Sequence, residues 1–327
     1  MEKFPITARS LEKFYKIDGD VFERQYKNHL SDFNDWDQKP HAQDWILYPE
    51  NIGHQLSIDE TSLSNGELYT IVTNKAGKGQ KGTLIAMIKG TKSEDIIKIL
   101  SKIKFRYRQK VTEITLDMAN SMNKIAKRCF PNAVKVIDRF HVQKLAYDAL
   151  QEIRIRHRWE AINEETNDKS NAKEDKTEYI PKVLENGDTL KLLLFRSRLL
   201  LFKSPEKWSD SQRQRAKILF KLYPDIEQAY WLVHKLRVIY NSSKEKASAR
   251  LKLARWYNEV TDFGDNAFNS VTGTIYSHAE DILNFFDNRS TNASAESFNA
   301  KLKYFRASLR GVSDVQFFLY RVAKIYA

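Results

Sequence analysis

Cysteine and long apolar segments are scarce in this chain of 327 residues. The single cysteine, Cys129, excludes a disulfide framework and any cysteine-based zinc site formed within the chain. Because Cys129 follows an amphipathic run, we expect it to be a small buried hydrophobic residue. No segment of the sequence has the pattern of a signal peptide, so we expect no secretory leader, and no apolar run approaches the roughly 18 residues that cross a bilayer. We therefore expect a cytoplasmic protein.

Acidic residues are too few to balance the basic ones. Lys and Arg number 54 against 42 Asp and Glu, so the formal net charge is +12. The excess is uneven, with 16 basic against 8 acidic residues in 54–141 and 7 against 2 in 289–327. If these two blocks fold together, they form one cationic surface, which suits a polyanionic partner such as nucleic acid.

Residues 1–53 predict a short helical segment followed by a linker. Residues 7–31 have the pattern of two short helices at helix-turn-helix spacing, and the second would expose Arg24 and Lys27 as candidate DNA contacts. A plain helical hairpin packed on the core is an equally good interpretation. The stretch 36–49 contains two Trp and two Pro and predicts a linker that docks on the body of the protein.

Residues 54–141 have the pattern of a mixed α/β domain. Three β-rich runs at 55–61, 68–73 and 83–89 are separated by turn residues, which predicts an antiparallel meander. They are followed by a helix from Ser93, a strand at 111–117, a helix at 121–130 and a strand at 133–138. This order of elements is the ribonuclease H-like topology, with 54–141 as the first part of the core.

Residues 142–290 predict a largely helical region. The polar run 163–177 interrupts it and predicts a solvated or disordered loop. We expect the tryptophans of this region to be mostly core anchors, with stacking on an unpaired base as the alternative for one of them. They are Trp159, Trp208, Trp231 and Trp256.

Residues 294–311 predict a closing helix that ends at Gly311. Apolar residues recur along it at spacings of 3 and 4, which indicates one buried face: Ala295, Phe298, Leu302, Phe305 and Leu309. A second row at the same spacing carries one acid, Glu296, and then candidate DNA contacts: Asn299, Lys303, Arg306 and Arg310. An acid in the first turn also complements the helix dipole, so Glu296 alone decides nothing.

Three acids occur where a ribonuclease H-like sheet would use them. Asp59 is on the first strand and Asp117 ends the fourth, and these strands are neighbours in such a sheet. Two carboxylates at adjacent strand ends repel each other unless a cation lies between them. With Glu296 they would complete an oxygen cage for two Mg²⁺ ions. Asp138 and His141 follow the fifth strand, where a structural contact between strand and helix is the alternative role.

Five motifs, taken in order, resemble the DDE insertion-sequence transposases of the ISL-three group over about residues 50–327. They are Ile58-Asp59-Glu60, Leu116-Asp117-Met118, Phe130-Pro131-Asn132-Ala133, Asp138-Arg139-Phe140-His141 and the segment 292–301. The resemblance implies a ribonuclease H-like fold with an all-helical insertion, 142–290, before the closing helices at 291–327. It also implies a metal-binding triad of Asp59, Asp117 and Glu296, with Asp138 and His141 arranging the active site.

The leading hypothesis is a bacterial, nucleoid-associated transposase that cleaves DNA at insertion-sequence ends and transfers the strand to target DNA. The resemblance implies two Mg²⁺ ions, with Mn²⁺ as a substitute. The alternatives are a ribonuclease H-like nuclease or resolvase, and an inactive DNA-binding remnant. Relatives usually begin with a zinc ribbon and a fuller helix-turn-helix region, whereas no cysteine precedes Cys129. We therefore expect recognition of the ends to need a companion chain, or a homodimer or higher assembly on DNA.

Overall fold

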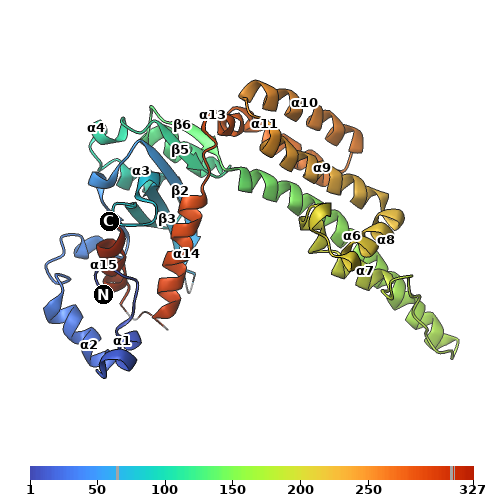
Figure 1. The fold of residues 1–327 in the computed structure, drawn as a ribbon, viewed down its shortest axis with the longest axis horizontal. Coiled ribbons are helices and arrows are strands. Elements are labelled where there is room, and N and C mark those ends of the chain that lie inside the picture. The colour runs from blue at the N-terminus through green and yellow to red at the C-terminus, as the bar shows by residue number, and fades with distance from the viewer. Residues whose placement is uncertain (64–65, 310–311, 313) are drawn as a thin grey trace. The chain divides into compact units, whose positions relative to one another are not determined.

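The computed structural model describes residues 1–63, 66–309, 312 and 314–327. The chain forms two compact units. Unit 1 comprises Met1–Asp138 and Asn288–Ala327, and unit 2 comprises Arg139–Asp287 (Figure 1). Among the helices of the described ranges, none combines the length and the apolar character needed to cross a bilayer.

Unit 1 contains a six-stranded mixed sheet with the strand order β1-β4-β3-β2-β5-β6. Its strands are β1 (Trp45–Leu47), β2 (Gln55–Ser62), β3 (Leu68–Asn74), β4 (Leu84–Lys89), β5 (Glu113–Leu116) and β6 (Val134–Ile137). The pairs β1–β4, β3–β4 and β2–β3 are antiparallel, whereas β2–β5 and β5–β6 are parallel. A meander that continues into parallel strands confirms the predicted ribonuclease H-like fold.

Strand β1 differs from the prediction of a linker at residues 36–49. The strand is three residues long and lies at the edge of the sheet, where it pairs only with β4. Such a short run has no readable alternation of polar and apolar residues. Pairing with a distant strand, not local sequence, makes this segment β.

The helices of unit 1 lie before, between and after the strands. They are α1 (Ala8–Tyr15), α2 (Gly19–Gln25), α3 (Ser93–Leu100), α4 (Phe105–Arg108), α5 (Asn120–Cys129), α14 (Ala293–Ser308) and α15 (Val315–Tyr326). Ser93 is the first residue of α3, and Lys92 is its N-cap. Cys129 is 0% exposed, as predicted, and burial raises the pKa of its thiol to about 11.

Helix α14 lies against the sheet through its predicted apolar row (Figure 1). Phe298, Leu302 and Phe305 are fully buried, in one cluster with Tyr69 and Ile71 of β3. Each large apolar side chain removed from water in this way contributes roughly 1.5–3 kcal/mol. The helix is therefore held to the sheet along its length, which positions its polar row. Arg310 and Gly311, predicted to close the helix, lie outside the described residues.

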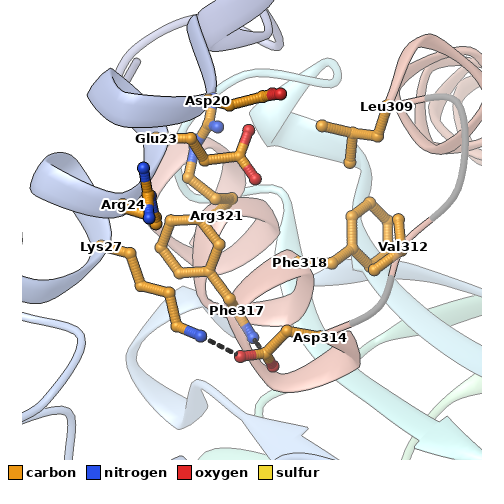
Figure 2. Close-up of a pocket in the computed structure, with 10 residues that line it drawn as sticks. All are labelled: Asp20, Glu23, Arg24, Lys27, Leu309, Val312, Asp314, Phe317, Phe318 and Arg321. Carbon is orange, nitrogen blue, oxygen red and sulfur yellow. Dashed lines mark hydrogen bonds and ion pairs between the residues drawn. The ribbon is translucent and has the colours of Figure 1, made fainter.

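The N-terminal segment packs on α15 through residues that precede α1 and follow α2. Phe33 makes edge contacts with Phe317 and Tyr320, at ring-centroid distances of 5.2 and 5.4 Å. The buried guanidinium of Arg321 donates from Nη2 to the carbonyl oxygens of Met1 and Ile6, at 2.9 Å each. A cavity of about 310 Å³ lies between α2 and α15 (Figure 2). The C-terminal helix therefore holds the start of the chain.

Unit 2 is all-helical, as expected for the insertion. Its helices are α6 (Arg139–Glu174), α7 (Leu190–Arg196), α8 (Asp210–Leu222), α9 (Pro224–Ser242), α10 (Lys246–Phe263), α11 (Asn266–Ser277), α12 (Ala279–Leu283) and α13 (Phe285–Asn288), the last of which ends at the unit boundary. Helix α6 packs on α7, α9 and α11.

Two predictions for unit 2 were wrong. Most of the polar run 163–177 is not a loop, because α6 continues to Glu174. Its exposed surface is stabilised by ion pairs such as Lys169 to Glu165, an i,i+4 pair at 2.6 Å. The second prediction was that the tryptophans of this region are mostly core anchors. Trp256 is a core anchor at 1% exposed, but Trp159 and Trp231 are 58% and 42% exposed.

Candidate functional site

The register of β2 and β5 brings Asp59 and Asp117 to the same level of the sheet. The two strands are parallel, and Ser57 of β2 pairs with Thr115 of β5. Asp59 and Asp117 each follow two residues later, so they lie level and on the same face. Both side chains are half-buried. The sheet therefore places these two predicted acids side by side.

Helix α14 contacts this position directly through Asn299. Asn299 Nδ2 donates to Asp59 Oδ2 at 2.7 Å, and the backbone N–H of Glu60 donates to Asp59 Oδ1 at 2.9 Å. These two bonds orient the carboxylate. The side chain of Asn299, which the sequence predicts as a DNA contact, is 6% exposed and faces β2 in this structure.

Glu296 lies on α14 one turn before Asn299. A spacing of three residues puts both side chains on the same side of a helix. Glu296 is exposed, and its backbone N–H donates to Asn292 O at 2.9 Å in the first turn. The contact between Asn299 and Asp59 thus brings the N-terminal end of α14, with Glu296, toward the acids of the sheet.

The cationic row predicted behind Glu296 does not form one exposed surface. Arg306 is 5% exposed, and its Nη2 pairs with Glu67 at 2.7 Å. Lys303 is exposed, and Arg310 lies outside the described residues. Two members of the row, Asn299 and Arg306, are buried because each contacts a carboxylate of unit 1. Arg306 therefore has a structural role in this conformation.

Negative charge gathers at this edge of the sheet. Burial, followed by the charges of Asp117 and Asp59, raises the pKa of the Glu60 carboxyl above its usual value. Several buried polar atoms nearby in sequence or register have no hydrogen-bond partner among the described residues: Ser57 Oγ, Thr73 Oγ1, Asn299 Oδ1 and both amide ends of Asn292. Oxygen donors of this kind are those that Mg²⁺ and Ca²⁺ prefer.

Comparison of the sequence with models of protein families shows the family to which the chain belongs. The family model of the DDE transposases of the ISL3 (ISL-three) group, described as "Transposase", matches residues 56–322. The chain belongs to this transposase family. No curated protein and no solved structure matches it. As a member of the family, it is a DNA-processing enzyme of insertion-sequence transposition, and DDE transposases generally use divalent metal ions.

The side chains at this position of the transposase are of the kind that suits a divalent cation. The acids and unpartnered oxygen atoms at the edge of the sheet are hard donors, and the mutual repulsion of the acids favours a bound cation. In the described part of the chain, no three His, Cys, Asp or Glu side chains stand close enough to hold a metal ion.

Sequence reasoning missed a buried ion pair beneath the acids of the transposase. Lys75 Nζ lies 3.2 Å from Glu113 Oε1 and also donates to the hydroxyl of Thr115. Glu113 is 4% exposed and further accepts from Ser290 and Asn288, which lead into α14. The sequence predicts only that Lys75 lies in a turn. The single feature that could have indicated a buried ion pair is the position of this lysine at the end of a buried strand.

Burial affects the two partners of this pair differently. Burial by itself would raise the pKa of Glu113, but the hydrogen bonds from Ser290, Lys75 and Asn288 and the charge of Lys75 bring it below its usual value. Burial lowers the pKa of Lys75, and the charges of Glu113 and Asp138 oppose this shift. The pair therefore anchors the segment before α14 to β5.

The remaining predicted site residues follow β6 or lie on helices. Leu116 of β5 pairs with Ile137 of β6, so Asp138 lies beside Asp117 at the ends of these two strands. Asp138 is 2% exposed, directly after β6, and its backbone N–H donates to Leu116 O at 3.1 Å. His141 is the third residue of α6 and belongs to unit 2. Arg24 is exposed on α2, whereas Lys27 pairs with Asp314 at 2.5 Å (Figure 2).

Proposed function

We propose that this transposase cleaves a phosphodiester bond at the ends of its insertion sequence and joins the freed 3′-hydroxyl to target DNA, with Mg²⁺ as cofactor. The observation that carries the proposal is the hydrogen bond from Asn299 to Asp59. It connects the helix of Glu296 to the strand of Asp59, at the level of Asp117, which directly follows β5.

Asp59, Asp117 and Glu296 would hold the metal ions. Bound divalent cations supply Lewis-acid chemistry, which activates an attacking oxygen and stabilises a leaving one in phosphoryl transfer. The chain itself orients Asp59 through two hydrogen bonds and presents Glu296 on an exposed helix end, where a DNA phosphate has access. Asp138 and His141 remain predictions of the family signature, as residues that arrange the active site.

The test compares three variants, Asp59→Asn, Asp117→Asn and Glu296→Gln, with the wild-type chain on labelled DNA of the element ends. Each variant is expected to lose cleavage by about 10³-fold or more while DNA affinity stays near wild type, because contacts between basic residues and DNA phosphates carry most of the binding. Cleavage at a near wild-type rate in any one variant removes that residue from the triad.

The products of the same assay separate the alternative functions. Joined products support a transposase with strand transfer, and cleavage without joining supports a nuclease or resolvase. Binding without chemistry in the wild-type chain with Mg²⁺ or Mn²⁺ supports an inactive remnant.

We also propose that tight recognition of the ends requires a second copy of this chain or a companion chain. Base-specific contacts carry sequence information, whereas phosphate contacts from exposed cations such as Lys303 and Arg24 do not. In the N-terminal hairpin, Lys27 is already paired with Asp314 and is therefore a weak candidate for a base contact. The isolated chain is titrated against element-end and scrambled duplexes at physiological salt. A preference above about 10³-fold, the lower end for dedicated DNA readers, would contradict the proposal.

A further inference from the structure

Four polar side chains of unit 2 form what we call the Arg154 cluster: Gln151, Arg154 and Arg158 of α6, and Arg198 after α7. Arg154 is 5% exposed, so its guanidinium has left water almost completely. Its Nε donates to Gln151 Oε1 at 2.7 Å, and its Nη1 donates to the carbonyl oxygen of Leu194 at 2.8 Å. Both acceptors are neutral.

No carboxylate in the described part of the chain balances the charge of Arg154. Burial, then the charges of Arg158 and Arg198, lower the pKa of Arg154 to about 10. Among the described residues, no carboxylate pairs with any of the three arginines of the cluster, whereas Arg156, Arg196 and Arg215 of the same unit each pair with an aspartate. A buried charge without a counter-charge is costly, and unpaired buried arginines are rare for this reason.

The cluster also contains buried donors without acceptors. Arg158 Nε and Gln151 Nε2 are buried and make no hydrogen bond to any described residue, and Gln151 itself is 9% exposed. The guanidinium of Arg158 lies 5.2 Å from the ring centroid of Phe195, which is 57% exposed. The cluster therefore extends from Arg154, which is buried, to an accessible rim formed by Arg198, which is exposed.

A structural role explains only part of this arrangement. Arg154 bonds a carbonyl in the last turn of α7, and a cation there complements the helix dipole. That role needs one arginine. It does not explain why two more arginines are brought near the same guanidinium, where they repel it, or why buried donors remain unpaired.

We propose that the Arg154 cluster binds a phosphate group, most naturally one from the backbone of bound DNA, with free phosphate as the other source. Guanidinium groups match phosphate oxygens through paired N–H donors, and one phosphate would balance the charge and accept from the unpaired donors. The DNA source rests on the proposed function, whereas the phosphate chemistry does not.

The experiment measures binding of the full chain to a random-sequence duplex at several salt concentrations. The variants are Arg158→Gln, Arg198→Gln, their combination, and Arg158→Lys, which keeps the charge but loses the planar fork. The combined variant is expected to bind about tenfold more weakly. The slope of log affinity against log salt is expected to fall by roughly 0.9, the value for one phosphate. Arg158→Lys should recover only part of the affinity.

The matched control is Arg156→Gln on the same helix. Arg156 is exposed and pairs with Asp265 at 2.9 Å, so its charge is already balanced, and its loss should change affinity less than about twofold. Thermal denaturation of each variant checks that the fold is retained, since the substituted residues lie toward the rim.

A second arm titrates inorganic phosphate against the same variants and follows the melting temperature. A changed salt slope without an effect of free phosphate supports the site with DNA as the source. Stabilisation of the wild type by free phosphate, lost in the variants while duplex binding is unchanged, supports the site with free phosphate as the source. Unchanged salt slopes together with no phosphate effect would overturn the proposal. Failure of the proposed function has a separate readout, the absence of cleavage by the wild-type chain.

Discussion

Unit 2 contains two buried charged clusters that differ in how their charge is balanced. We call the first the Asp188 cluster. Asp188 is 0% exposed, and it accepts from Arg196, from Arg215 at 2.9 Å and from Asn186 at 2.8 Å. In the Arg154 cluster, by contrast, the buried arginine meets neutral acceptors and two further arginines. The described residues balance the charge of the first cluster but not that of the second.

The difference teaches that burial alone does not separate structural from functional polar groups. A buried charge that finds its counter-charge and donors within the chain stabilises the fold, whereas one that lacks them indicates a ligand. Unit 1 repeats the contrast. Glu113 has a lysine and two further donors, whereas Asn299 gives its Nδ2 to Asp59 and leaves a buried Oδ1 without a partner among the described residues.

The largest effect on stability is expected for Asp188→Asn. The change leaves two arginines without their counter-charge and should lower the free energy of unfolding of unit 2 by about 3–5 kcal/mol. Hydrogen exchange of the full chain, followed in α7 and α8, measures it. Glu259→Gln is the control, because Glu259 pairs with Lys235 at the surface and its loss should cost about 0–1 kcal/mol. Equal effects of the two changes would remove the contrast between the clusters.

A smaller effect with a clear pH dependence is expected for Glu113→Gln. The variant should lose about 2–3 kcal/mol of stability at pH 7, because Lys75 loses its buried counter-charge. The loss is limited because the unpaired lysine can release its proton and become neutral. The pKa of Glu113 in the fold lies below its ordinary value of 4.5. Its stabilisation is therefore present above the unfolded-state pKa and is lost as the pH falls through the folded-state pKa. The difference between wild type and variant should shrink below about pH 4. A difference that stays constant to about pH 3 would contradict this account.

The smallest effect on stability, together with a distinct effect on activity, is expected for Asn299→Ala. Loss of the bond that orients Asp59 should reduce cleavage by about 10- to 100-fold, as for other residues that position metal ligands. Ser297→Ala on the exposed side of the same helix is the control and should leave cleavage unchanged.

Asn299→Asp distinguishes positioning from packing. It keeps the size of the side chain but puts a second carboxylate beside Asp59, which raises the pKa of Asp59. Activity should then fall more steeply at acidic pH than in the wild type. An unchanged pH profile would indicate that Asn299 acts only by packing.

The sequence by itself determined the elements with strong local patterns. β-rich runs bounded by turn residues and helices predicted β2 to β6, and a row at spacings of 3 and 4 predicted the buried face of α14. The order of the elements was enough to predict a ribonuclease H-like sheet and to place Asp59 and Asp117 on neighbouring strands. Each of these conclusions depends on residues close together in the chain, whose periodicity reports which side of an element is buried.

Only the tertiary structure decided which polar residues meet. Asn299 and Arg306 have the spacing of an exposed row, yet they contact Asp59 and Glu67, which lie 240 and 239 residues away in the chain. Strand β1, the pair of Lys75 and Glu113, and the Arg154 cluster depend on distant partners in the same way. The reason is physical. A polar side chain at the edge of a buried face is exposed or buried according to what the opposite element presents, and local sequence carries no information about that element.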